Sequence, residues 1–93
     1  MFSITPIDTT KIDEKDLEKQ LLRIGLMAEL DAINLYEQLA ALSKDEIIKQ
    51  TFKNIAGEEK EHIGELETLL LRHDPEQIKE LKEGTTEVEE LDK

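Results

Sequence analysis

Residues 35–52, LYEQLAALSKDEIIKQTF, hold the break between two long helical patterns. The break falls at Ser43-Lys44-Asp45-Glu46, which has the spacing of a capping box. We predict that the Ser43 side chain accepts a hydrogen bond from an amide of the following helix and that Glu46 reaches back. Because only about two or three residues connect the helices, the two must lie antiparallel as a helical hairpin.

The helical patterns extend in both directions from this break. The first helix is predicted from Asp13 to about Leu42, and the second from the break to about Arg72. The second helix should then close at a short polar segment, where Asp74 acts as a cap and Pro75 takes the first position of a short third helix.

These signals divide the chain into three parts. Residues 1–12 are predicted to form an extended N-terminal arm, which ends where Thr10 or Asp13 caps the first helix. Residues 13–83 form the helical domain. Residues 84–93, GTTEVEELDK, are interpreted as an acidic tail or linker with too little apolar content to fold alone, so the third helix should end at their leading glycine.

Length and composition favour helices that need a partner. The chain has 93 residues, of which 38% are apolar and 38% charged, a balance that suits helices with one or two apolar faces better than a thick core. Apolar side chains of the first helix spread well beyond a single stripe: Leu21, Leu22, Ile24, Leu26, Met27, Ala28, Leu30, Ile33, Leu35, Leu39 and Leu42. The predicted fold class is therefore all-α, an antiparallel two-helix hairpin with a short C-terminal helix, dimerising into a four-helix bundle.

The same composition excludes several classes of function. With no cysteine, the chain has no disulfide, thiolate metal site, iron–sulfur cluster or cysteine nucleophile, and a reducing cytoplasm is compatible. A net charge of −11 argues against a nucleic-acid partner. The start MFSITPIDTT lacks an export signal, and no run approaches the roughly 20 apolar residues of a membrane span, so we expect no membrane partner.

Each long helix carries an apolar seam that is interrupted by polar groups at its centre. The seam of the second helix reads Ile48, Phe52, Ile55, Glu59, His62, Leu66 and Leu69, and that of the first reads Leu22, Leu26, Glu29, Ile33, Tyr36 and Ala40. Glu29 lies 14 residues before Ser43 and Glu59 lies 16 residues after it. At 1.5 Å per residue both are about 21 to 24 Å from the turn. Glu29, Glu59 and His62 should therefore converge inside the core, where charge is costly unless it is paired or binds a metal.

This donor set suits iron. Carboxylate oxygens hold both Fe(II) and Fe(III) and can bridge two metals, while imidazole adds a neutral ligand. Glu59 and His62, at i and i+3, project from one helical face, and di-iron bundles combine two such pairs with one glutamate from each of two other helices. Doubling Glu29, Glu59 and His62 by a two-fold axis completes that set, with Glu59 best placed to bridge, so we predict a di-iron centre shared between two subunits.

Other interpretations of these residues stay open. A lone Glu-x-x-His occurs often by chance, and Glu58 could replace Glu59, although its own row of residues is more solvated. Tyr36 is either a core residue or a partner of the site. We expect His73 to interact with carbonyls at the end of its helix. A solvated face is expected for Glu61, Glu65 and Glu67.

The segments AELDAINLYEQLA (28–40) and GEEKEHIGELETLLLRHDPE (57–76) resemble the encapsulated ferritins, two-helix ferritin-like proteins housed in encapsulin nanocompartments. The resemblance covers roughly residues 15–83. It implies a ferritin-like four-helix bundle with a ferroxidase centre at the subunit interface, whose residues match Glu29, Glu59 and His62, with Tyr36 as the aromatic residue beside the site.

The resemblance also implies partners and a location. Family members assemble as a ring of dimers, commonly a decamer, in the cytoplasm within an encapsulin shell that stores the mineral. Of the family's extra acidic pair, thought to admit metal, this chain keeps Asp31 but has Ala28, so such a site is not expected. A shell-targeting peptide is missing at Asp92-Lys93, which leads us to hypothesise that the chain is the N-terminal domain of a shell fusion.

Three functions are consistent with the pattern. The leading hypothesis is a ferroxidase that uses iron at the shared site. A rubrerythrin-like di-iron peroxidase normally relies on a cysteine-ligated iron, and the absence of cysteine weighs against it. The third is a structural or adaptor bundle in which Glu29 and His62 only pair with each other.

Overall fold

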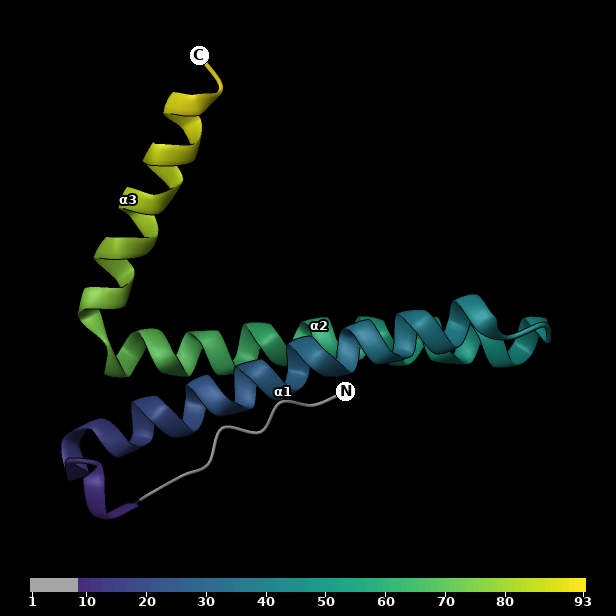
Figure 1. Cartoon of the computed structure of the whole chain (residues 1–93), viewed down its shortest axis with the longest axis horizontal. Helices are drawn as coiled ribbons and strands as arrows, with labels where there is room; N and C mark the ends of the chain where they lie inside the picture. Colours follow the sequence, from purple (N-terminus) through teal and green to yellow (C-terminus); the bar gives the residue numbers. More distant parts are fainter. Residues whose placement is uncertain (1–8) are drawn as a thin grey trace.

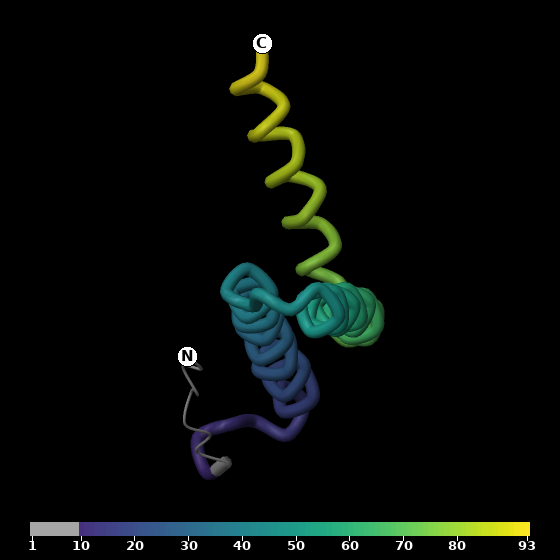
Figure 2. The backbone as a smooth tube through the Cα atoms, turned by 90° about the vertical axis from the view of Figure 1, so that its right-hand side faces the viewer, coloured from purple at the N-terminus to yellow at the C-terminus, as the bar shows by residue number. Residues whose placement is uncertain are grey.

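The computed structural model describes residues 9–93 and is built from helices alone over that range. A 3-10 turn, Thr9–Lys11, precedes three α-helices: α1, Glu14–Leu42, α2, Glu46–His73, and α3, Pro75–Leu91. Figure 1 shows α1 and α2 side by side as an antiparallel hairpin, with α3 leaving its open end at a steep angle. The end-on view in Figure 2 shows the same two-helix layer. The all-α class and the hairpin are confirmed.

The start of α1 agrees with the sequence prediction, but the conformation predicted for the arm before α1 does not. Asp13 precedes the helix in an extended conformation, and its carbonyl accepts a hydrogen bond from the Asp16 amide at 2.9 Å, although its side chain makes no capping bond. Residues 1–8 lie outside the described part of the chain. Residues 9–11 form a 3-10 turn, so the prediction of an extended arm was wrong there; such turns are frequent at helix N-termini.

Asp45, and not Ser43, caps α2. The Asp45 Oδ1 atom accepts hydrogen bonds from the amides of Ile47 at 2.9 Å and Ile48 at 3.0 Å. The Ser43 hydroxyl instead bonds to the backbone of Asp45, while the Ser43 amide donates to the Leu39 carbonyl and closes α1. The capping-box prediction was wrong. The Ser43 hydroxyl is occupied within the turn between the helices, so the Asp45 side chain, directly before α2, is the nearest acceptor for the first amides of that helix.

The interior of the hairpin is thin. Its most buried side chains are small or medium in size: Ala40 is 2% exposed, Ala56 3% and Leu70 5%. A Cβ atom placed on Gly25 would lie 3.4 Å from Leu66 Cδ1, so the glycine lets α1 approach α2 closely at that level. Two helices in contact along one narrow line bury little apolar area, which limits the stability of a single hairpin.

Many large apolar side chains therefore remain at the surface. Exposed large hydrophobic residues are Leu21, Met27, Leu30, Leu35, Leu42, Ile47, Ile48, Leu69, Ile78, Leu81, Val88 and Leu91. They occur on all three helices, because the helices carry more apolar surface than one hairpin covers. None of the helices within residues 9–93 is long and apolar enough to cross a bilayer.

The third helix is held at its start and runs further than predicted. Asp74 caps it through the Gln77 amide, with Pro75 at the first position, as predicted. Asp74 is only 8% exposed, and its Oδ2 atom also pairs with Arg23 Nη2 at 2.8 Å, which ties the start of α3 to α1. The expected end at Gly84 was wrong: α3 continues to Leu91, and Gly84 has no positive φ of the kind that ends a helix.

Replacing Gly84 by alanine should strengthen α3. No atom lies within 4 Å of the added Cβ, so the gain in helix propensity, about 0.5–1 kcal/mol, is not offset by a clash. Slower amide hydrogen exchange in residues 81–91 would measure it. Gly25→Ala is the control, since its Cβ meets Leu66 at 3.4 Å and should gain less. Unchanged exchange in Gly84→Ala would contradict a continuous helix through this position.

Candidate metal centre

The three predicted ligands come together from two helices. Glu29 lies near the middle of α1, and Glu59 and His62 lie near the middle of α2. One ligand atom from each residue can be chosen so that all lie within 4.8 Å of one another. The His62 Nδ1 atom is 3.3 Å from Glu29 Oε2 and 3.5 Å from Glu59 Oε2. The spacing argument thus placed these side chains at one level, and their role as metal ligands stays a prediction.

Local packing explains why the three groups meet. Glu59 and His62 are one turn apart on α2 and share a face. Gly25 is one turn before Glu29, and Leu66 is one turn after His62, so in an antiparallel pair Gly25 and Leu66 are neighbours next to the site. A Cβ built on Gly25 would lie 3.4 Å from Leu66 Cδ1, which shows that α1 and α2 are packed against each other one turn from the cluster.

An aromatic pair lies on the other side of the cluster. Tyr36 is seven residues after Glu29 and Phe52 seven before Glu59, which places both about 10 Å along the helices from the carboxylates. Their ring centroids are 5.9 Å apart with the planes tilted by 34°. The contact shown for Tyr36 is therefore aromatic packing, and its hydroxyl makes no hydrogen bond within residues 10–93. A role for Tyr36 at the site remains a prediction.

The cluster lies at the surface of the hairpin and is only partly covered. The side chains of Glu29 and Glu59 are 24% and 18% exposed, whereas that of His62 is 44% exposed. Two carboxylates beside one imidazole leave an excess of negative charge at this point. Such a group of oxygen and nitrogen donors can bind a transition-metal ion, and its open side can receive further ligands.

Neighbouring acidic residues stand apart from this cluster. Glu58 is exposed, and Asp31 lies on a different side of α1; neither belongs to a cluster of three possible ligands in the described range. His73 lies in the last turn of α2, and its exposed side chain forms no hydrogen bond within residues 10–93, so its expected interaction with the helix-end carbonyls stays a prediction. The solvated face is confirmed for Glu61, Glu65 and Glu67.

Comparison with known proteins identifies the family. The sequence profile of the EncFtn-like family matches residues 5–87, which is most of the chain. The chain belongs to the EncFtn-like family. The resemblance to encapsulated ferritins read from the sequence is thereby confirmed.

Two curated relatives of this EncFtn-like chain are associated with encapsulin. A ferritin-like–encapsulin shell fusion protein from Pyrococcus furiosus is 50% identical over 93 residues, covering 98% of this chain and 27% of the relative. The encapsulin nanocompartment cargo protein EncC from Myxococcus xanthus is 36% identical over 74 residues, covering 80% of this chain and 56% of the relative. The chain thus spans about a quarter of the first relative and about half of the second.

A solved structure confirms the fold of this EncFtn-like chain. The crystal structure of an encapsulated ferritin domain from Pyrococcus furiosus aligns with a TM-score of 0.82 and 47% sequence identity, covering 92% of this chain and 93% of that domain. At that identity the two chains share the ferritin-like fold, and the alignment spans nearly all of both.

Proposed function

We propose that this chain is a ferroxidase, which oxidises Fe(II) to Fe(III) at a site shared by two copies. The observation that carries the proposal is the cluster of Glu29, Glu59 and His62, whose ligand atoms lie within 4.8 Å of one another. Two carboxylates and an imidazole are donors that accept iron in both oxidation states, so the ion can change charge without leaving its ligands. Membership in the EncFtn-like family supports an iron role.

One chain supplies half of a di-iron site. The bundle pattern for two irons needs four carboxylates and two histidines, and a two-fold pairing of this cluster provides that number. Ile48, Ile55, His62 and Leu69 recur every seven residues along one side of α2, and within this stripe Ile48 and Leu69 are 48% and 42% exposed. A second copy that covers the stripe would enclose His62 together with them.

In the proposed pair, each subunit contributes the same three residues, Glu29, Glu59 and His62. In this proposal Glu59, at the least exposed position of the cluster, would bridge two ions, while Glu29 and His62 would each be a ligand to one ion. Each Fe(II) gives up one electron. Two ions together supply the two electrons that, with two protons, reduce dioxygen to hydrogen peroxide. The carboxylates compensate the added positive charge of Fe(III), and covering the site limits access of water to it.

The proposal extends to partners and location. We infer that copies of the chain act as a ring of dimers inside an encapsulin shell, which receives the Fe(III) as mineral. The names of the two relatives support this, since one is a fusion to an encapsulin shell and the other a nanocompartment cargo. Whether this chain belongs to a fusion or travels as separate cargo depends on the sequence that surrounds it.

Iron binding and oxidation by the wild-type chain test the proposal. After anaerobic incubation with Fe(II), elemental analysis should find about one iron per chain, two for each pair of subunits. Admitting air should then produce Fe(III) faster than buffer does, with iron absorbance as the measurement. Glu61→Ala, an exposed change on the same helix, should behave like wild type. Iron-free protein would favour a structural bundle with a Glu29–His62 pair, and oxidation no faster than in buffer would overturn the ferroxidase.

A further inference from the structure

A groove lined by lysines lies between α1 and α2, toward the turn of the hairpin. Its volume is about 540 Å³. Small residues, including Ala41 and Ala56, form part of its lining. The charged residues of the lining are Glu37 from α1 and Lys49, Lys53 and Lys60 from α2. We call this feature, defined by these six residues, the lysine groove.

The lysine groove is a positive site on a negative chain. The whole chain has 23 acidic and 12 basic residues, which gives it a net charge of −11. Residues 47–57 of α2, by contrast, include Lys49 and Lys53 and no aspartate or glutamate, and residues 38–42 of α1 have no charged side chain. In the groove, three lysines therefore stand beside the carboxylate of Glu37. This local excess of positive charge favours an anionic ligand.

Two of these lysines have no carboxylate partner. The Nζ atom of Lys60 lies 3.6 Å from Glu37 Oε2. The ammonium groups of Lys49 and Lys53 form no ion pair or hydrogen bond within residues 10–93, although the chain is rich in carboxylates. Lys49 is also half-buried. Because an ammonium group has three N–H donors and no acceptor, these two side chains are available to bind an anion.

Lys49 and Lys53 have the spacing to hold one anion together. They are four residues apart, which places them on one face of α2 with their Cβ atoms about 5–6 Å apart. Phosphate suits such a pair, because it concentrates more than one negative charge and several acceptor oxygens on one small ion. A side-chain carboxylate carries less charge on fewer oxygens. Since a water molecule takes about 30 Å³ in the liquid, the groove has room for phosphate with water around it.

The lysine groove and the apolar seam of α2 lie on different sides of that helix. Phe52 and Glu59 belong to the seam, and Lys53 and Lys60 directly follow them in the sequence. One residue corresponds to a rotation of about 100° around an α-helix. A second copy that covers the seam therefore approaches another side of α2, and an anion in the groove does not touch the cluster of candidate metal ligands.

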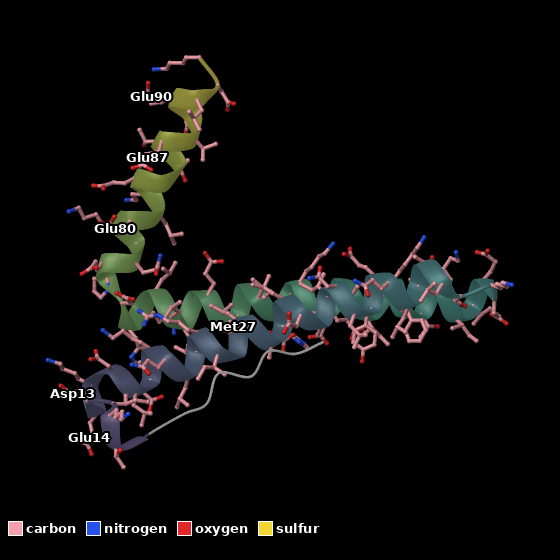
Figure 3. The ribbon with its side chains drawn as sticks, viewed as in Figure 1. Asp13, Glu14, Met27, Glu80, Glu87 and Glu90 are labelled. Carbon is pink, nitrogen blue, oxygen red and sulfur yellow. The ribbon has the colours of Figure 1, made fainter. Side chains whose placement is uncertain are left out.

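A second pair of lysines, on α3, lacks the surroundings of the groove. Lys79 and Lys82 are also one turn apart, and both are exposed. Lys82 lines a hollow together with Glu83 and Glu87. Figure 3 shows Glu80 and Glu87 on this helix, well away from the hairpin. Because carboxylates this close repel an anion, the α3 pair provides a comparison for the groove within the same chain.

We propose that the lysine groove is a phosphate-binding site, in which Lys49 and Lys53 donate hydrogen bonds to one phosphate ion. The site goes beyond the proposed function, because it needs no metal and involves none of the three candidate ligands. Glu37 opposes binding in two ways: it adds a negative charge to the groove, and it pairs with Lys60. Removing that carboxylate should therefore strengthen the binding of phosphate.

Acetylation of lysines in the metal-free wild-type chain locates the site. The chain is treated with an acetylating reagent in the presence and absence of inorganic phosphate at equal ionic strength, and the modified lysines are counted by mass spectrometry. Phosphate should slow the acetylation of Lys49 and Lys53 and leave that of Lys79 and Lys82 unchanged. Equal protection of both pairs, or protection of neither, would overturn the proposal.

Variants test which groups bind the ion. Isothermal titration with inorganic phosphate, with chloride as the other anion, measures the Kd. Lys49→Gln with Lys53→Gln should raise the Kd about tenfold, whereas the matched control, Lys79→Gln with Lys82→Gln, makes the same change in net charge and should keep the wild-type Kd. Circular dichroism should show that both proteins are helical. If the two double variants bind phosphate equally well, the groove is not the site.

Two further substitutions change the groove without altering a lysine. Glu37→Gln should lower the Kd for phosphate by up to about fivefold, because it removes a repulsive charge and frees Lys60. Ala41→Glu adds a carboxylate at an exposed position of the lining and should raise the Kd. Opposite shifts are expected of electrostatic binding in this groove, and shifts in any other direction would contradict it. Since every measurement is made without iron, failure of the ferroxidase proposal would leave these results unaffected.

Discussion

Replacing Glu59 by alanine is expected to lower the rate of iron oxidation by on the order of 100-fold or more. Glu59 is the least exposed member of the cluster, and in the proposed site it would bridge the two ions. In a site with two-fold symmetry one substitution removes two ligands, so the loss is larger than for a site within one chain. Glu29→Ala and His62→Ala should have effects of the same order. The initial rate of Fe(III) formation after mixing anaerobic Fe(II)-loaded protein with air is the measurement.

Glu58→Ala is the matched control for this prediction. It removes a carboxylate from the adjacent position of the same helix, where the side chain is exposed and outside the cluster, and it should keep nearly the wild-type rate. Tyr36→Phe should also have a smaller effect, because the ring contact with Phe52 is retained. Normal oxidation by Glu59→Ala together with loss in Glu58→Ala would show that the neighbouring carboxylate is the ligand.

Assembly of the chain should depend on metal. In the proposed pair without iron, four carboxylates from two copies would lie at close range and repel one another. A metal that binds the paired state and not the single hairpin stabilises the pair by about 2.7 kcal/mol at a hundredfold excess over its Kd. We therefore expect Fe(II) to lower by about 100-fold the protein concentration at which half of the chains are paired.

Light scattering under anaerobic conditions, with and without Fe(II), measures this shift over a range of protein concentrations. Exposed apolar residues such as Ile48 and Leu69 still favour pairing in the metal-free protein, so the shift should be clearest at low concentration. His62→Ala is the comparison, because it retains the apolar stripe and loses a ligand. A monomer that does not respond to iron, or identical assembly of both proteins at every concentration, would contradict a shared site.

Features that depend on neighbours along the chain were available from the sequence. Helical periodicity defined α1 and α2, and the short break between them required an antiparallel hairpin. Counting residues from that break put Glu29 and Glu59 at one level, because an α-helix has a constant rise. Asp74 and Pro75 marked the start of α3, since caps act within one turn.

Features for which two local signals compete could not be predicted from the sequence. Two possible caps, Ser43 and Asp45, lie two residues apart before α2, and the folded turn decides for Asp45. Gly84 is a weak helix former that is tolerated inside α3, so its presence did not decide where the helix ends.

Contacts between distant positions were decided by the tertiary structure alone. Arg23 and Asp74 are 51 residues apart, and nothing in either local sequence indicates that they pair at 2.8 Å and tie the start of α3 to α1. The pairing of Lys60 has the same origin: Lys60 looks like an ordinary solvated residue of α2 until α1 places Glu37 Oε2 3.6 Å from its Nζ atom. Periodicity determines which side of a helix a residue occupies, but the partner across the interface depends on how the whole chain packs.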